Sequence, residues 1–544
     1  MKKRHLPVHF QNFLTIVTRH LSLVTCHASR VTCHLSLVTR HLSLVTCHLS
    51  LVTCHLSILL LLLTALTPSA ARAADKMDFA RADQLTYRFY QEKKWDSLII
   101  IGKQALRQDI DYYYLRIRMG IAYYERGQFI TAINHFSTAL KFNVADPVGL
   151  EYLYFCYLNS NRATDAYSLL PSMSPEMRTR LYIKTPVIEE VRMEGGGNFT
   201  AGGQSKGRQS QSGTKAIYSE IDRYGNSYYG NAGVRVNLWN VISLKAAYNY
   251  LNFSKTKSFN WSLIEDRLVK KADCTWGYYN HYSFDTVYKD TTCDYRINQN
   301  EAFLEARIML PAGFRIIPSF HMLNVRYPNI QAHYVGQTVY DTLYYVSNLD
   351  SAITFPFNRT IYSFTQNDTS FYNYVAGITV TKDFSIFTMG LSGSWSNLNG
   401  KTQVQAGGSL TYYPLGNLNL YGNTTLTGFF QGSDSRLLLN QMIGAKITPW
   451  LWAEATLLYG DYTNANIYNG AIVYNNSDKI DYRLGANLIF VLSKHFQLSV
   501  IYQYYRKEYQ QLYYVKTTDN LFVPQTKYYP YSTNSIIGGI TWKL

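Results

Sequence analysis

Residues 301–310 read Glu-Ala-Phe-Leu-Glu-Ala-Arg-Ile-Met-Leu, a stretch in which apolar and charged residues alternate. One set of alternate positions holds Ala302, Leu304, Ala306, Ile308 and Leu310, and the other includes Glu301, Glu305 and Arg307. Because successive side chains of a β-strand point to opposite faces, this period of two predicts a strand with one apolar and one polar face.

The same alternation recurs in residues 231–238, 242–250 and 483–492. From residue 188 onward we expect 14 strands, which begin near residues 188, 229, 241, 301, 314, 371, 385, 402, 417, 436, 451, 481, 496 and 535. A soluble β-sandwich also alternates, so the joins decide between the two folds. Joins after even-numbered strands are short and most of the others are long, which is typical of outer-membrane barrels. We therefore predict an antiparallel transmembrane β-barrel of about 14 strands over residues 188–544.

The ends of the predicted strands fit this interpretation. Trp239, Trp395, Trp450 and Trp452 lie where interfacial aromatic girdles belong. The last strand carries Gly539, Trp542 and Leu544, which resemble the C-terminal assembly signal of outer-membrane proteins, with Leu in place of the usual Phe. This resemblance implies the barrel-assembly machinery and the outer-membrane lipid bilayer as partners. Pro318 lacks a backbone donor, so we expect a bulge or a shift in its strand.

The polar faces of these strands should line the lumen. The charged residues assigned to that face by their alternation are Arg192, Glu194, Arg235, Lys245, Glu305, Arg307, Lys446, Glu454 and Arg483. Inward charges of mixed sign either line a polar channel or form ion pairs between strands that fill a narrow one. The sequence leaves both alternatives open.

Residues 78–180 follow a different period, of 34 residues. The middle unit is defined by Gly120, Tyr123, Gly127, Phe129, Ala132, Phe136 and Ala139. This unit resembles a tetratricopeptide repeat, in which small residues let two antiparallel helices approach and aromatic residues fill the remaining space. Lys93 and Asn161 replace the turn glycine in the flanking units. The resemblance implies an α-solenoid of about three helix pairs that docks a periplasmic protein partner, with Tyr112, Tyr113, Tyr114, Arg116 and Arg118 as candidates for its binding face.

The predicted fold class is therefore α + β multidomain, with an N-terminal α-solenoid, a linker over residues 181–187 and the barrel. Residues 1–57 contain a repeated heptapeptide, His-Leu-Ser-Leu-Val-Thr-Cys, which we interpret as a translated tandem DNA repeat rather than a metal tract or a coiled coil. Residues 58–73 combine nine mostly apolar residues with Ala71 and Ala73, as in a secretory signal peptide. We expect an outer-membrane protein with its repeats in the periplasm.

Composition excludes some classes of protein. The net charge is +16, but its basic residues are spread along the chain or lie in the leader, so we expect no nucleic-acid partner. The mean hydropathy of −0.17 excludes a polytopic helical membrane protein. Cys274 and Cys293 fall in the expected second outer loop, residues 254–300, and we predict a disulfide between them. Cys156 fits a small buried hydrophobe within a repeat helix.

Two functions from different classes fit these features. One is a channel or an export protein whose repeats dock a partner or substrate, and the other is a non-conducting scaffold anchored in the membrane. The architecture resembles bacterial exopolysaccharide exporters, in which more numerous repeats precede a barrel. The sequence contains no His-Glu-x-x-His, no Gly-x-Ser-x-Gly and no phosphate-binding glycine loop, so we predict no catalytic, cofactor or metal residues and no enzymatic activity.

Overall fold

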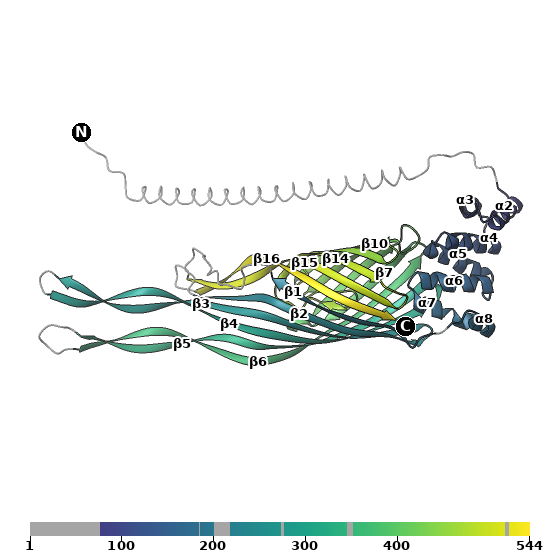
Figure 1. Cartoon of the computed structure of the whole chain (residues 1–544). Coiled ribbons are helices and arrows are strands. Elements are labelled where there is room, and N and C mark those ends of the chain that lie inside the picture. The colour runs from purple at the N-terminus through teal and green to yellow at the C-terminus, as the bar shows by residue number, and fades with distance from the viewer. Residues whose placement is uncertain (1–76, 184, 201–217, 274–276, 345–351, 517–521) are drawn as a thin grey trace, which may run out of the picture. The chain divides into compact units, whose positions relative to one another are not determined.

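The computed structural model describes residues 77–544 apart from 184, 201–217, 274–276, 345–351 and 517–521 (Figure 1). The predicted leader and signal peptide, residues 1–57 and 58–73, lie outside the described residues. Residues 78–544 form one compact unit that contains both the helices and the barrel.

The helices form three consecutive pairs and a short terminal helix, as the repeat pattern predicts. Their bounds are α2 (Phe79–Gln91), α3 (Trp95–Arg107), α4 (Tyr113–Glu125), α5 (Phe129–Phe142), α6 (Pro147–Asn159), α7 (Ala163–Ser168) and α8 (Pro175–Arg180), with a 3-10 turn at Leu170–Ser172. Among the described residues, no helix has the length and hydropathy to cross a membrane.

The repeat residues explain how α4 and α5 pack. A Cβ added to Gly120 would lie 2.7 Å from the ring of Phe136, so only glycine permits this approach. Phe136 and Ala132 are fully buried at the contact. Gly127 ends the first helix of the pair with a φ of 68°, in the left-handed region that favours glycine.

The second part of the chain is a closed antiparallel barrel of 14 strands, as predicted (Figure 1). The strands are β1 (Ile188–Thr200), β2 (Tyr218–Trp239), β3 (Ile242–Asp273), β4 (Gly277–Leu310), β5 (Phe314–Tyr344), β6 (Ala352–Phe384), β7 (Phe387–Ser396), β8 (Gln403–Tyr412), β9 (Leu420–Gln431), β10 (Asp434–Thr448), β11 (Leu451–Tyr459), β14 (Lys479–Val491), β15 (Phe496–Lys516) and β16 (Phe522–Lys543). Antiparallel pairing of β1 with β16 closes the barrel, with Glu190 opposite Lys543.

The prediction of long outer loops was partly wrong. Residues 254–273 and 277–300 belong to β3 and β4, which stay paired as far as Asp273 opposite Gly277. β5 and β6 extend in the same way, and Figure 1 shows both hairpins running beyond the neighbouring strands. Away from the apolar belt a strand need not keep one continuous apolar face, so the alternation becomes short and irregular while the backbone ladder continues. The starts predicted for β4 and β6 are therefore too late.

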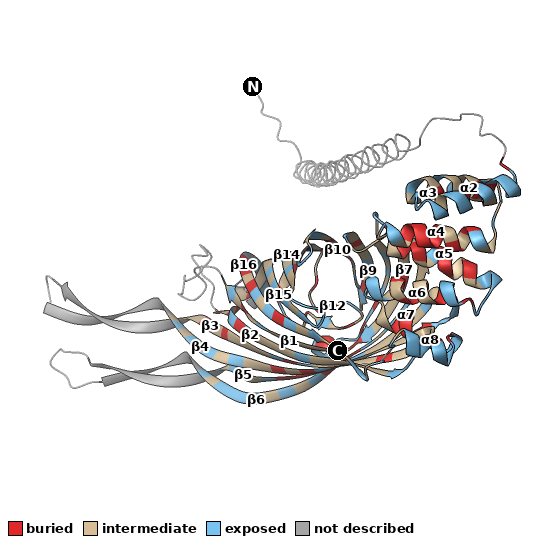
Figure 2. Ribbon diagram, turned by 45° about the vertical axis from the view of Figure 1, so that its right-hand side comes forward, coloured by how far each residue is buried: buried red, intermediate tan, exposed pale blue. Residues whose placement is uncertain are grey.

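Exposed residues alternate with buried or half-buried ones along strands such as β8, as the ribbon coloured by burial shows (Figure 2). Leu391, Leu437 and Ile536 are exposed on the outside, whereas Glu301 and Asn373 are buried. An exposed apolar surface on a closed barrel matches the lipid-facing surface of a membrane protein.

Three of the four tryptophans expected in aromatic girdles are exposed, namely Trp239, Trp395 and Trp450. Trp452 differs, because it is half-buried and lies two residues from Glu454, on the inward face of β11. Proximity to a strand end alone does not determine the face, since neighbouring residues point in opposite directions.

Pro318 interrupts the barrel wall on one side only. Pairing of β5 with β4 skips from Ser319 to Ile316, whereas pairing with β6 continues through Pro318, opposite Ile378. The interruption fits the missing N–H of proline. It also has a consequence inside the lumen, because the carbonyl of Ile317 accepts a hydrogen bond from elsewhere in the chain.

Candidate functional site: the barrel lumen

The join between β11 and β14 folds into the lumen instead of forming an outer loop. We call residues 460–478 the inserted segment. It contains two short strands, β12 (Asn466–Ile467) and β13 (Ile472–Val473), which pair only with each other. Figure 2 shows β12 inside the ring of barrel strands.

The tip of the inserted segment is bound to β5 and β6. Asn469 donates from Nδ2 to the carbonyl of Ile317 at 2.8 Å and accepts at Oδ1 from Thr379 at 3.0 Å. Its own carbonyl accepts from the hydroxyl of Ser319. The segment therefore uses the Ile317 carbonyl next to the interruption at Pro318.

His321 connects the same tip to the barrel wall. Its side chain is completely buried, with Nδ1 2.7 Å from the carbonyl oxygen of Gly470. On the other side of the ring, Nε2 lies 3.2 Å from a carboxylate oxygen of Glu301. The short distance to the carbonyl requires a proton on Nδ1, since a carbonyl oxygen only accepts.

Other strands hold the rest of the segment. Asn466 exchanges hydrogen bonds with Gln405 on β8, with the backbone N–H of Asn466 2.9 Å from Oε1 and Gln405 Nε2 2.9 Å from the Asn466 carbonyl. Arg436 on β10 donates to the carbonyl of Asp461 at 2.9 Å. Anchors on β5, β6, β8 and β10 fasten the segment around the wall, and we also call this segment, which lies inside the lumen, the plug.

Apolar packing adds to these hydrogen bonds. Tyr462 is 1% exposed and packs in a buried cluster with Phe429, Leu438, Leu458 and Ile480 from the wall. Its hydroxyl donates to the carbonyl of Leu439 at 2.7 Å. Full burial of a large apolar side chain stabilises a fold by roughly 1.5–3 kcal/mol, so this contact is a major anchor.

Two cavities are lined by the inserted segment. The larger has a volume of about 780 Å³ and is lined by residues 471–477 together with Arg192, Glu194 and Arg483. The smaller, about 260 Å³, is lined by residues 466–469 together with Glu305 and Arg307. The inserted segment thus forms part of the lining of both cavities.

The remaining predicted lumen residues mostly form pairs. Glu305 lies 3.7 Å from Arg235 and 3.9 Å from Arg307. Lys245 lies over the ring of Phe303 and Lys446 over that of Trp452. Glu454 accepts from the hydroxyl of Tyr421 at 2.5 Å and from Asn487 at 2.8 Å. Inward charges therefore pair between strands and also line the two cavities.

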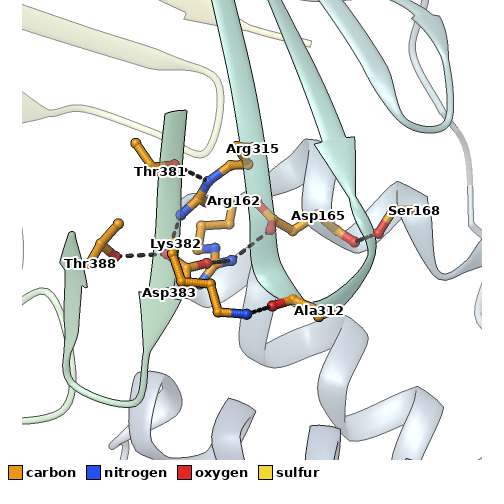
Figure 3. A network of polar contacts seen from close by, with 9 residues as sticks. All are labelled: Arg162, Asp165, Ser168, Ala312, Arg315, Thr381, Lys382, Asp383 and Thr388. Atoms are coloured by element: carbon orange, nitrogen blue, oxygen red, sulfur yellow. Dashed lines mark hydrogen bonds and ion pairs between the residues drawn. The ribbon is translucent and has the colours of Figure 1, made fainter. Parts of the chain in front are cut away.

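The repeat helices contact the short-turn end of the barrel through a buried network of charges (Figure 3). Arg162, at the start of α7, donates to Asp165 at 2.6 Å and to Asp383 of β6 at 2.5 Å. Arg315 of β5 pairs with the same two carboxylates, and Thr388 donates to Asp383 at 2.7 Å. Two arginines and two aspartates balance in charge, which offsets the cost of burying them.

The charges of this network are mutually stabilised. Burial disfavours the charged form of Arg162, but Asp165 and Asp383 outweigh it and raise the pKa of Arg162 above its ordinary value. Further contacts join the two parts, since Ile130 donates its N–H to the carbonyl of Gly416 at 2.8 Å and Asn417 donates to that of Gly127 at 3.1 Å. The helices are thus attached along several turns of the barrel.

The proposed partner face of the repeats is partly occupied by internal ion pairs. Arg118 lies 2.7 Å from Asp83, and Arg116 lies 2.6 Å from Asp111. Tyr112 also donates to Asp83, at 3.0 Å, whereas Tyr114 is exposed. Most of this polar face holds α4 against neighbouring segments.

The predicted disulfide is not tested, because Cys274 lies outside the described residues. Cys293 is a free, half-buried cysteine opposite Lys257. Asp273, the neighbour of Cys274, pairs with Gly277 at the far end of the same hairpin. Cys156 is fully buried, and burial raises its pKa, as expected for an unreactive thiol.

The residues of the predicted assembly signal lie at the closing seam. Gly539 is paired with Glu194 of β1, and Trp542 stacks on Phe496 of β15 with ring centroids 5.8 Å apart. Leu544 donates its N–H to the carbonyl of Glu189 at 3.2 Å. Their recognition by an assembly machinery stays a prediction.

Sequence reasoning missed the plug and the charge network. The sequence of residues 460–470, Gly-Asp-Tyr-Thr-Asn-Ala-Asn-Ile-Tyr-Asn-Gly, is rich in turn-forming residues and falls in a long join, the one between the predicted strands that begin near residues 451 and 481. Turn-forming residues suit a segment inside the lumen as well as an outer loop, so composition does not distinguish the two locations. No local signal marks Arg162 or Asp383, because the contact joins residues 221 positions apart.

No protein-family model matches this sequence, and no curated protein matches it. Among solved structures, the chain is similar to a Pseudomonas aeruginosa FadL homologue, with 10% identity, a TM-score of 0.35, and coverage of 65% of this chain and 90% of that chain. It is also similar to TodX, a monoaromatic hydrocarbon channel, with 6% identity, a TM-score of 0.34 and coverage of 66% and 90%. The helical part is similar to PcrH from Pseudomonas aeruginosa, with 16% identity, a TM-score of 0.17 and coverage of 20% and 89%.

Proposed function

We propose that this protein is an outer-membrane channel that is closed, in the state described, by the inserted segment. One observation carries the proposal. The inserted segment crosses a polar lumen and leaves a cavity of about 780 Å³ and another of about 260 Å³ along its length. The apolar outer face supports placement in a bilayer. Attachment of the repeats at the short-turn end favours a periplasmic position for them, because short turns are periplasmic in bacterial barrels.

The test is single-channel conductance of the full-length, refolded protein in planar bilayers. We expect little or no current from the wild type. A variant in which residues 462–476 are replaced by a short Gly-Ser linker should give a stable conductance, because the wall strands remain paired without them. Heat-modifiable migration on a gel checks that each barrel has folded.

Deletion of residues 78–180 provides the matched comparison. This variant keeps the plug, so its conductance should stay low although the barrel inserts. If the linker variant folds, inserts and stays silent, the channel proposal is wrong.

A scaffold is the second candidate, and the exposed surface of the repeats favours it. Phe79, Ile100 and Tyr114 are more than half exposed and are available to a periplasmic protein partner. A folded linker variant that does not conduct would support this function. The absence of enzymatic activity also stays a prediction.

A further inference from the structure

Arg483 of β14 is a buried cation without an acidic partner among the described residues. Its side chain is 3% exposed and lines the larger cavity. Nη1 donates to the hydroxyl of Tyr474 in the inserted segment at 2.7 Å, while Nε is buried and has no hydrogen-bond partner. A buried charge without compensation is costly, so this guanidinium is poised for a negatively charged partner.

A second cation lies near Arg483. Tyr505 of β15 is directly opposite Arg483 in the ladder, and Lys507 follows two residues later on the same face. Lys507 lines the same cavity, and its ammonium lies 4.9 Å from the ring centroid of Tyr505. Within the described part of the chain Lys507 forms no ion pair. Diagonal neighbours in a ladder have side chains close enough to contact one small ligand.

The carboxylates that line this cavity already have polar or charged partners within the described chain. Glu194 pairs with Arg192, and Asp222 lies 3.1 Å from Lys255. Glu301 lies 3.2 Å from His321 and accepts a hydrogen bond from Asn249 at 2.7 Å. Arg483 is therefore the buried lining cation that no carboxylate of the described residues compensates, whereas half-buried Lys507 lies within the electrostatic reach of buried Asp478 without forming an ion pair with it.

We propose that the larger cavity is a binding site for a small organic anion whose carboxylate is held by Arg483, with Lys507 adding charge. A guanidinium matches a carboxylate with two parallel N–H donors, and one of those nitrogens is unpaired here. Val473, Ile480 and Ile501 line the same space and contact the uncharged body of the ligand. A volume of about 780 Å³ accommodates such a molecule.

A role of this site in transport rests on the proposed channel, but binding itself does not. Equilibrium binding to the full-length protein in detergent is therefore the test, since it requires no current. The channel proposal fails if the linker variant carries no current, and the anion-site proposal fails if benzoate does not bind. The two failures can therefore be distinguished. The probes are sodium benzoate and its neutral isostere benzamide, titrated by calorimetry.

We expect the wild type to bind benzoate and not benzamide. Arg483→Gln should weaken benzoate binding at least about tenfold, because a charge-assisted hydrogen bond is lost. Arg506→Gln is the matched control, as Arg506 lies on the opposite face of β15 and outside the cavity. Equal binding of both probes, or unchanged benzoate affinity in Arg483→Gln, overturns the proposal.

Two further measurements distinguish a role of Arg483 in ligand binding from a role in holding the inserted segment. If Arg483 serves only to hold Tyr474, the Tyr474→Phe variant should lose as much benzoate affinity as Arg483→Gln. If Arg483 binds the anion, Tyr474→Phe should keep most of the benzoate affinity of the wild type. Arg483→Lys should retain part of the affinity by keeping the charge. Inorganic phosphate is the third probe, and binding of phosphate without binding of benzoate would contradict an organic carboxylate as the ligand.

Discussion

Lys93, Gly127 and Asn161 occupy the turns of three successive helix pairs and are spaced 34 residues apart. Their φ angles are 52°, 68° and 55°. Only Gly127 adopts this left-handed conformation without a steric cost, although asparagine tolerates it better than most residues. The repeat thus imposes one backbone geometry on three different residues.

Lys93→Gly is expected to stabilise the first helix pair. Left-handed backbone costs a non-glycine residue about 1–2 kcal/mol, and the entropy that glycine gains in the unfolded chain offsets about 0.5–1 kcal/mol. Native-state hydrogen exchange of the α2 and α3 amides measures the change. Lys103→Gly is the control and should destabilise the pair by roughly 0.5–1 kcal/mol, because exposed Lys103 lies within α3, where glycine is unfavourable. Exchange in Lys93→Gly that is no slower than in the wild type would contradict the prediction.

His135 makes the repeats sensitive to acid. Burial, aided by Arg116, lowers the pKa of His135 from 6.5 to about 3. Between these values the unfolded chain binds a proton that the folded chain excludes, so stability falls as pH drops from 6.5 towards 3. The slope is at most about 1.4 kcal/mol per pH unit.

His135→Gln should flatten this dependence between pH 6.5 and 5. Hydrogen exchange of α4 and α5 follows the local stability at each pH. The control is His495→Gln, which changes an exposed histidine at a barrel turn. If wild type and His135→Gln show the same slope, burial of His135 does not govern the acid response.

At the level of elements, the plug depends on a turn of unusual backbone. Tyr468, Asn469 and Gly470 all have positive φ, at 53°, 58° and 82°. Such a run persists only where surrounding contacts hold it, and here the contacts come from β5 and β6. The element is therefore defined by its neighbours rather than by its own propensity.

Asn469→Ala should loosen the tip of the plug. It removes the bonds to Ile317 and Thr379, a loss of about 1–3 kcal/mol when a buried carbonyl is left unpaired. We expect brief channel openings in bilayer recordings that the wild type lacks. Asn475→Ala is the control in the same segment, because the side-chain oxygen of Asn475 has no hydrogen-bond partner. Records from Asn469→Ala that stay as silent as those of the control would contradict this role.

At the level of the whole molecule, the charge network joins repeats to barrel. Arg162 and Asp383 should show a coupling energy of about 0.5–3 kcal/mol in a double-mutant cycle with alanine, because they are in direct, mostly buried contact. Local opening of α7, followed by hydrogen exchange, measures each variant. The exposed pair Arg180 and Glu151 is the control and should couple by no more than about 1 kcal/mol. Equal coupling in both pairs would mean that the network does not fasten the repeats.

Much of the architecture could be predicted because it follows from local patterns. Alternation at residues 301–310 indicated a strand and its inward face, and the 34-residue period indicated helix pairs with turns at Lys93, Gly127 and Asn161. Both patterns act over a few neighbouring residues, so they are visible in the sequence. The extended hairpins were missed because apolar residues alternate in them only over short runs, such as Phe259, Trp261 and Leu263.

The sequence by itself determined that this chain forms helical repeats followed by a 14-stranded barrel with a polar lumen. Only the tertiary structure decided that residues 460–478 fill that lumen and that Arg162 meets Asp383. These contacts join residues far apart in the chain, such as His321 and Gly470, which are 149 positions apart. Asparagine, glycine and tyrosine suit an exposed loop as well as a plug. Their location depends on which hydrogen-bonding groups the closed barrel presents, and these groups come together only once the barrel has closed.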